Sequence, residues 1–268
     1  MIGEFRADGA RWRVDFAAGR SIALDLDPHG TNPAFFAAGP VRAEPLRLGA
    51  FVGRMAAGGS CNAEVVHFAP HCHGTHTEGL GHVLAEAPPL KDTTETAPGF
   101  AWLASVEARA PAACADDAPS RGAAALIPRA ALEAATREAP AACRALVLRT
   151  LPNDAGKRGR NYDEAPYPVL SRQAAAWLAA GRWRHLLVDT PSLDPADDGG
   201  ALANHRAWWG LAGDGAPAHA ARRSVTEMVF VPDDIPDGLY WLDIGVSPLA
   251  SDAVPSRPVL YPVKAARP

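Results

Sequence analysis

The sequence has little of what marks several classes of protein. Its four cysteines, in a chain of 268 residues, show no paired spacing, so neither a disulfide framework nor a zinc ribbon is expected. The first residues contain no apolar segment of the signal-peptide kind, and no run of about 20 apolar residues occurs, so neither a secretion signal nor a membrane span is expected. A reducing cytoplasm fits these absences.

The sequence also lacks an excess of basic charge. The net charge of −4 provides no electrostatic footprint for nucleic acid, so no nucleic-acid partner is expected. The longest basic cluster, residues 157–160, is short, and we expect it to be a solvated loop. No Gly-x-Ser-x-Gly elbow is present, which argues against a Ser-His-Asp hydrolase and leaves Ser192 a structural role in its proline turn.

What remains is an ordinary globular composition, with 48% hydrophobic and 21% charged residues, ample for a core. No domain boundary is apparent, so a single domain over residues 1–268 is expected. Strand and helix patterns alternate, but several strands follow one another through turns, which favours a mixed-sheet α/β fold. The expected strands are 21–27, 63–69, 100–109, 124–128, 144–150, 185–190, 224–231, 238–246 and an edge strand 257–265, and the expected helices are 129–138, 172–180 (capped by Ser171 and ended by Gly181) and 203–209.

The most informative segment is 71–82, which reads His-Cys-His-Gly-Thr-His-Thr-Glu-Gly-Leu-Gly-His. It holds four of the nine histidines and one carboxylate, the ligand types that zinc, manganese and iron accept. A packed core has no use for four such rings, because each buried ring needs a hydrogen-bond partner. The alternative is a polar loop that happens to be rich in histidine.

The spacing within this segment favours a site. His76 and Glu78 share a face if the chain is extended there, and Glu78 and His82 share a face if it is helical. A chain that passes from extended to helical would therefore aim all three at one point. The expected strand 63–69 ends before Pro70. The histidine-rich segment would then begin at the end of a strand, where sites of α/β folds tend to lie.

Three neighbouring residues are weaker candidates. His73 is expected to face solvent or to support a ligand rather than to bind metal. His67, inside the expected strand, is expected to be a hydrogen-bonded structural histidine. Cys72 is a possible zinc ligand, but alternation points it away from His71, and a lone cysteine is a weak signal.

The segment needs closing ligands from elsewhere, and two residues qualify. His205 follows a long polar loop after an expected strand. Glu227 lies among apolar neighbours in the pattern of a central strand, where a carboxylate is costly unless it is paired or bound to metal. The alternatives are that Glu227 faces solvent from an edge strand and that His205 caps a helix. Of Trp208 and Trp209, at most one can share the helix face of His205.

These residues together resemble a known family, the cyclases that include bacterial kynurenine formamidase and isatin hydrolase. The family signature is similar to His-x-Gly-Thr-His-x-Asp-x-x-x-His, then Asp-Thr-x-Ser-x-Asp, then His-Arg, then a strand Glu. The matching residues here are Gly74-Thr75-His76-Thr77-Glu78 and His82, then Asp189-Thr190-Pro191-Ser192-Leu193-Asp194, then His205-Arg206, then Glu227. The order matches over residues 71–227, and the flanking strands extend the resemblance to nearly the whole chain.

The resemblance implies a swivelling β/β/α fold, commonly assembled as a homo-oligomer, and a set of site roles. His71 and His76 would bind a first metal, and Glu78 would bridge two metals. His205 would bind the second metal, Glu227 would touch both, and His82 would be the general acid/base.

The function implied is hydrolysis of an amide, formamide or lactam-type C–N bond in a small-molecule substrate. One or two ions, zinc or else manganese, would polarise the carbonyl group and lower the pKa of a bound water to about 7.

Two departures from the family pattern leave alternatives open. Cys72 stands where the family has its first histidine, so His71, His73 and Cys72 are all alternatives for that ligand. Glu78 replaces an aspartate, which lengthens the arm by one methylene. These departures motivate a second hypothesis, a catalytically divergent or non-catalytic member of the fold that binds a small molecule.

Overall fold

The centre of the protein is a large mixed sheet. A computed structural model describes residues 1–93, 98–211 and 215–266, and its main sheet has the strand order β1-β2-β17-β15-β9-β11-β13-β14-β8-β16, with β3 also paired to β17. The parallel strands at its centre are β9 (Gly99–Glu107), β11 (Ala145–Leu151), β13 (His185–Val188) and β14 (Ser224–Glu227). Antiparallel neighbours extend it: β15 (Gly238–Asp243), β17 (Val259–Ala265), β2 (Ala10–Asp15), β1 (Ile2–Ala7) and β3 (Arg20–Ser21) on one side, β8 (His76–Glu78) and β16 (Ala253–Pro255) on the other. The mixed-sheet α/β prediction is therefore confirmed.

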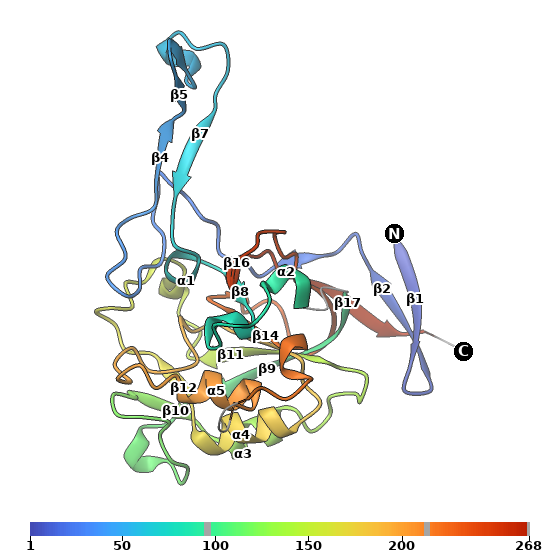
Figure 1. Ribbon diagram of the computed structural model, residues 1–268. Coiled ribbons are helices and arrows are strands. Elements are labelled where there is room, and N and C mark those ends of the chain that lie inside the picture. Colours follow the sequence, from blue (N-terminus) through green and yellow to red (C-terminus); the bar gives the residue numbers. More distant parts are fainter. Residues whose placement is uncertain (94–97, 212–214, 267–268) are drawn as a thin grey trace.

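Helices cover one face of this sheet (Figure 1). They are α3 (Arg129–Ala135), α4 (Arg172–Ala180) and α5 (Ala203–Trp209). Side chains alternate along β11: Leu146 and Leu148 pack in the core beneath the helices, whereas Val147 packs in the core on the opposite face. Because both faces are covered, β11 and β13 contain continuous apolar runs, residues 145–148 and 186–188, as in other buried parallel strands.

The ends of α4 follow the sequence prediction. The Ser171 hydroxyl accepts a hydrogen bond from the Ala174 amide at 3.0 Å, and the Gly181 amide donates to the Leu178 carbonyl. These two contacts satisfy backbone groups that the helix itself leaves unpaired at its ends.

A two-stranded arm projects from the body of the molecule (Figure 1). Its stem pairs β4 (Arg42–Pro45) with β7 (Glu64–His67), and its tip pairs β5 (Arg47–Leu48) with β6 (Phe51–Val52). The expected strand 63–69 thus exists, but it lies in this arm and not in the main sheet. The chain returns to the body at Pro70, which begins the short helix α1 (Pro70–His73).

Two other predictions are wrong. Of the expected strand 21–27, only Ser21 belongs to a strand, β3, and Ala23 forms one isolated bridge. The expected edge strand 257–265 is internal, because β17 pairs with β15 on one side and with β2 on the other. Hydrophobic periodicity identified this strand but could not name its neighbours.

The remaining short elements lie at the periphery. They are β10 (Ala125–Ile127), which pairs with β12 (Pro168–Leu170), and the helix α2 (Leu90–Thr93). None of the helices in the described ranges is long and apolar enough to cross a membrane.

Candidate metal centre

The histidine-rich segment has the backbone that its spacing predicted. Residues His76–Glu78 form β8, and Leu80–His82 form a 3-10 turn immediately after it. The extended part places His76 and Glu78 on one face, and the turn brings His82 back until its Nδ1 lies 3.6 Å from Glu78 Oε2. The three residues therefore converge.

The strand register supplies the next member. β8 pairs antiparallel with β14, and Glu227 lies directly opposite His76, with 3.4 Å between Glu227 Oε2 and His76 Nε2. Glu227 is 3% exposed on an internal strand, so the alternative of an edge strand facing solvent is wrong. The next residue, Met228, has a φ of 54°, a left-handed conformation that is strained for a non-glycine residue.

Helix α5 supplies a second buried imidazole. His205 lies inside this helix, whose cap is Leu202, so the alternative of a capping histidine is wrong. Its Nε2 lies 2.9 Å from Glu78 Oε1 and 3.3 Å from Glu227 Oε1. Trp209, one turn later, stacks on the His205 ring at a centroid distance of 6.0 Å, so one tryptophan shares the face of this histidine, as the helix geometry requires.

These four side chains form what we term the inner group: His76, Glu78, His205 and Glu227. Their exposed fractions are 0–3%, yet the Nε2 atoms of both histidines and both carboxylate oxygens of Glu78 have no hydrogen-bond partner in the part of the chain that the structure describes. Buried polar atoms are normally paired, and two buried carboxylates side by side are especially costly. A cation held between these atoms would remove that cost, and imidazole and carboxylate are suitable donors for it.

The other atoms of the inner group are held by the surrounding chain. His205 Nδ1 hydrogen-bonds with Asp194 Oδ2 at 2.7 Å, and His76 Nδ1 with the Gly74 carbonyl at 3.0 Å. The Leu193 amide donates to Glu227 Oε1 at 2.9 Å. The contacts at both Nδ1 atoms leave each Nε2 directed at the centre, the arrangement usual for histidines that bind metal.

A second set, the outer group, borders the first on the solvent side. It consists of His71, His82 and Asp252, whose side chains are 27%, 23% and 40% exposed. His71 Nε2 lies 3.0 Å from Asp252 Oδ2, and its Nδ1 lies 3.3 Å from Glu78 Oε2. His82 Nδ1 lies 3.6 Å from the same oxygen of Asp252, so one carboxylate serves two imidazoles.

The electrostatics of the inner group depend on opposite charges at short range. Burial acts to raise the pKa of Glu78, but His205 and two further histidines outweigh it and hold that pKa well below its usual range. For Glu227, burial and the Glu78 carboxylate act to raise the pKa, while the two buried imidazoles lower it by more. Burial lowers the pKa of His205, but the surrounding carboxylates raise it well above its usual value. The neighbouring imidazoles thus favour the ionised form of both carboxylates.

The outer group shows the same pairing. Burial lowers the pKa of His71, but the hydrogen-bonded carboxylate of Asp252 and the nearby carboxylate of Glu78 outweigh it and raise the pKa from 6.5 to about 10. The hydrogen bond with His71, followed by the nearby His82 imidazole, holds the pKa of Asp252 far below its usual range.

Three sets of ligand atoms each lie within 4.8 Å of one another: His71, His76 and Glu78; Glu78, His82 and His205; and His71, His82 and Asp252. Glu78 belongs to two of the sets. It is thus placed where one carboxylate can reach two neighbouring ion positions.

The weaker candidates lie elsewhere. His73 is buried, accepts a hydrogen bond from the Ala69 amide at Nδ1 and contacts the Gly39 carbonyl at Nε2, so it neither faces solvent nor reaches the inner group. Of the three alternatives for the first ligand, His71 is the one that reaches Glu78, and Cys72 is in none of the three sets. His67 lies on the arm, where it hydrogen-bonds with Glu44 as a structural histidine would.

One basic residue departs from its prediction. The cluster 157–160 was expected to be solvated, but Lys157 is only 6% exposed, and its ammonium group is paired with Asp189. The sequence also failed to identify Asp252, because it lies in a loop far along the chain with no motif around it. Asp194 was visible within the family motif, but its contact with His205 was not predictable from spacing.

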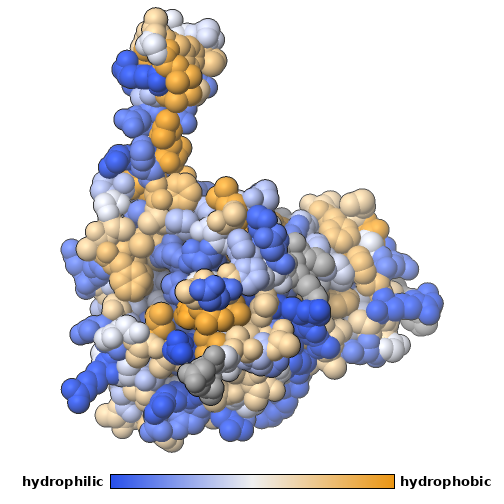
Figure 2. All heavy atoms as spheres, in the orientation of Figure 1, coloured by the Kyte–Doolittle hydropathy of each residue, from blue (hydrophilic) through white to orange (hydrophobic). Residues whose placement is uncertain are grey.

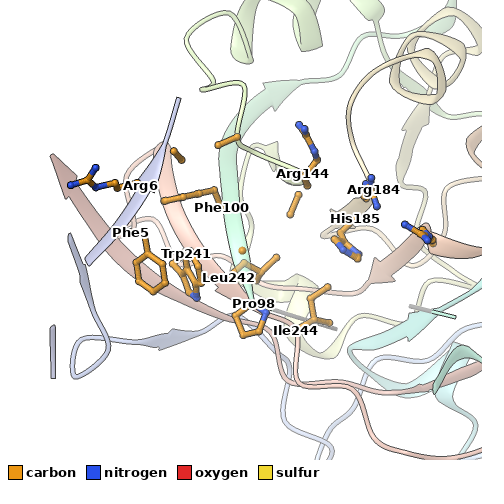
Figure 3. Close-up of a pocket in the computed structure, with 15 residues that line it drawn as sticks. Phe5, Arg6, Pro98, Phe100, Arg144, Arg184, His185, Trp241, Leu242 and Ile244 are labelled. Atoms are coloured by element: carbon orange, nitrogen blue, oxygen red, sulfur yellow. The ribbon is translucent and has the colours of Figure 1, made fainter. Parts of the chain in front are cut away.

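The cavity in Figure 3 does not belong to this centre. It has a volume of about 550 Å³ and is lined by residues at the amino ends of the parallel strands, including Phe100, Arg144 and His185, together with Trp241. The candidate metal centre lies at the opposite, carboxyl ends, where Glu227 is the last residue of β14 and the segment after β13 begins. Sites of open α/β sheets usually lie at those carboxyl ends.

Comparisons with known proteins agree with this geometry. A family model described as "Putative cyclase" matches residues 20–195. Isatin hydrolase A from Labrenzia aggregata, solved bound to benzyl benzoate, is similar in structure at 15% identity and a TM-score of 0.62, covering 91% of this chain and 94% of that one. Isatin hydrolase A from Ralstonia solanacearum is similar at 17% identity and a TM-score of 0.61, covering 91% of each chain.

A third similar structure is a predicted metal-dependent hydrolase from Bacillus stearothermophilus. It is 14% identical, with a TM-score of 0.56, covering 91% of this chain and 97% of that one. At such low identity these structures establish a shared fold. No curated protein sequence matches this chain.

Proposed function

This chain belongs to the cyclase family, and on that premise we propose that it is a metal-dependent hydrolase that cleaves an amide, formamide or lactam-type C–N bond in a small molecule. The observation that carries the proposal is the inner group. Two imidazole Nε2 atoms and two carboxylates converge in the interior, and several of these atoms have no hydrogen-bond partner among the described residues.

The ligand roles follow from the distances. His71, His76 and Glu78 would hold a first ion, and Glu78 and His205 a second, with Glu227 in reach of both. Imidazole and carboxylate donors suit zinc best, with manganese as the second choice. Bound there, such an ion supplies a Lewis acid that polarises the substrate carbonyl and lowers the pKa of water to about 7.

His82 is the residue placed to move protons. It borders the inner group through Glu78 but is 23% exposed at its side chain, so it can exchange protons with both the site and solvent. It would take a proton from the attacking water and return it to the leaving nitrogen. His205 and His76 lack that freedom, because their Nδ1 atoms are engaged and their side chains are buried.

Metal analysis and hydrolysis assays on the purified protein test the proposal. We expect one or two equivalents of zinc or manganese, loss of activity after chelation and recovery on adding the metal back. Isatin represents the lactams, an N-formyl arylamine the formamides and a simple aryl amide the amides. His76→Ala should lose metal and activity, while His67→Ala on the exposed arm is the matched control that should keep both.

The competing hypothesis is a catalytically divergent member that binds a small molecule. A protein without bound metal, whose activity is unchanged in His76→Ala, would rule out the metal-dependent hydrolase. Bound ligand without turnover of any of the three compounds would favour the divergent binder.

We further propose that copies of the chain associate through the arm. Leu48 and Met55, near its tip, are 64% and 60% exposed, and Figure 2 shows apolar surface along the arm. Apolar surface of this kind often marks an interaction site. Light scattering after size-exclusion chromatography should give a multiple of the chain mass, reduced by Leu48→Asp with Met55→Asp. A wild-type protein with the mass of one chain would contradict this.

The compartment proposed is the cytoplasm. All four cysteines are free, which suits a reducing environment.

A further inference from the structure

Lys157 is a buried cation with a complete set of partners. Its Nζ donates to Asp189 Oδ2, to the Thr150 carbonyl and to Thr150 Oγ1, each at 2.8 Å. A buried ammonium group is costly to desolvate and persists where its hydrogen bonds are satisfied. The desolvation cost of the Lys157 ammonium group is offset by the side chain and backbone that it holds in place.

The charge holds Asp189, at the carboxyl end of β13. Asp189 Oδ2 also accepts from the Thr150 amide at 2.8 Å, and Oδ1 accepts from Thr150 Oγ1 at 2.9 Å. Asp189 is only 1% exposed. Lysine, threonine and aspartate therefore form one closed group that ties the end of β11 to the residue that follows β13.

The segment that begins at Asp189 leads directly to the metal centre. We term residues 189–194 the connector. Near its end, the Leu193 amide donates to Glu227 Oε1, and Asp194 Oδ2 binds His205 Nδ1. Within it, Thr190 Oγ1 donates to the Ser192 carbonyl, and the Asp194 amide donates to Ser192 Oγ, so a shift at its start is carried towards its end.

We propose that Lys157 is a positioning residue of the metal centre: by holding Asp189 it fixes the connector, and through the connector it orients Glu227 and His205. The inference rests on the proposed function, because it takes these two side chains to be metal ligands. Lys157 itself does not touch the inner group. Its effect is the alignment that contacts behind metal ligands generally provide.

Arg149 is a matched control. It lies on the same strand, β11, is also buried at 7% exposure, and is bound by Asp237 at 2.9 Å and by the Pro232 and Ile235 carbonyls. None of these partners belongs to the connector. Replacing Arg149 should therefore lower stability without altering the alignment of Glu227 and His205.

The experiment compares Lys157→Met with Arg149→Met in the full-length protein, with Co²⁺ as the probe. Co²⁺ affinity is measured by competition with a chelator, its coordination by visible absorption, and folding by thermal denaturation. Lys157→Met should bind Co²⁺ about 10–100-fold more weakly, with an altered absorption band, as is typical when a contact behind a ligand is lost. Arg149→Met should remain within about twofold of the wild type, because distant sites act independently.

Each other outcome also decides the proposal. Wild-type affinity and absorption in Lys157→Met overturn it, and so does an equal loss in both variants, which would be a general effect of destabilisation. If Lys157→Met does not fold, the Co²⁺ affinity and absorption of Asp189→Asn are judged by the same criteria. Lys157→Arg, which keeps the positive charge, should show the wild-type Co²⁺ absorption band. A wild-type protein that binds no Co²⁺ overturns the proposed function itself, and the inference with it, which is a different result from failure of the variant alone.

Discussion

The inner and outer groups use the same residue types in two different ways. Each contains two histidines and at least one carboxylate, but the inner side chains are 0–4% exposed and the outer side chains are 23–40% exposed. The inner residues come from β8, β14 and α5, whereas the outer ones come from a short helix, a 3-10 turn and a loop. Strands and a regular helix therefore supply the buried inner group, and short or irregular segments supply the solvent-exposed outer group.

The difference concerns what holds each side chain. Contacts with Gly74, Leu193 and Asp194 fix His76, Glu227 and His205 from behind and leave the Nε2 atoms of both histidines unpaired. In the outer group, both imidazoles lie between the carboxylates of Asp252 and Glu78, and each has access to water. An inner residue is therefore suited to binding an ion tightly, and an outer one to exchanging protons and adapting to a substrate.

Removing an inner carboxylate should have the largest effect. Glu78→Gln keeps the shape of the side chain but removes the charge that two of the three ligand sets share. We expect loss of bound metal and activity no higher than that of the chelated wild type. Metal content by mass spectrometry together with the hydrolysis assay measures this, and a variant that keeps its full metal content would remove Glu78 from the ligands.

Removing the outer histidine of the 3-10 turn should affect turnover and not metal content. We expect His82→Ala to lower kcat by about 10²–10⁴-fold, the usual contribution of general acid/base catalysis. Metal content should stay at the wild-type level, because His82 is not among the residues proposed to hold the ions. If His82→Ala lost metal content and kcat to the same extent, His82 would act as a metal ligand like the residues of the inner group.

Acid should weaken metal binding, because metal and protons compete for the same nitrogens. With no metal bound, the pKa of His71 is raised to about 10 and that of His205 well above its usual value, so both carry protons near neutral pH. Metal affinity should therefore rise with pH, by about tenfold per pH unit for each proton displaced. Calorimetry in buffers of different ionisation enthalpy counts these protons, and an affinity independent of pH would contradict the prediction.

The metal-free protein should show the opposite trend in stability. The pKa of His71 is raised on folding. The contribution of His71 to the free energy of unfolding is therefore complete below about pH 6.5 and is lost as the pH rises through about 10. The metal-induced increase in Tm should therefore grow over this range, which thermal denaturation with and without metal can measure.

Removing the shared outer carboxylate should have the smallest effect. Asp252 is 40% exposed, and ion pairs of such exposure contribute about 1 kcal/mol or less, equivalent to no more than about fivefold. We expect Asp252→Ala to change KM or kcat within that factor and to leave metal content unchanged. A loss above about a hundredfold would place Asp252 among the ligands and enlarge the inner group.

Local patterns predicted much of the fold and half of the site. The apolar runs of β11 and β13 and the capped helix α4 could be predicted because their signals lie within about ten residues. The convergence of His76, Glu78 and His82 followed from periodicity alone. Glu227 was detectable because a carboxylate in a buried strand is costly.

The remainder depended on contacts between distant parts of the chain. Asp252 is 181 positions from His71, and no local pattern joins them. The choice between His71 and His73 depended on the orientation of a four-residue helix, and spacing does not determine that orientation. Lys157 appeared to be one of a solvated cluster, because its burial is created by β11 and β13, which the loop itself does not contain.

The arm has a consequence for redesign of this protein. Arg42 and His67 are directly paired across its stem, so the two ends of residues 43–66 lie about 5 Å apart. A short turn can bridge such a gap, so the arm is a removable module: it can be trimmed, or exchanged for another hairpin, while the main sheet keeps its register. His71 lies only four positions beyond the stem, and the same junction therefore offers a direct route for coupling a grafted hairpin to the metal centre.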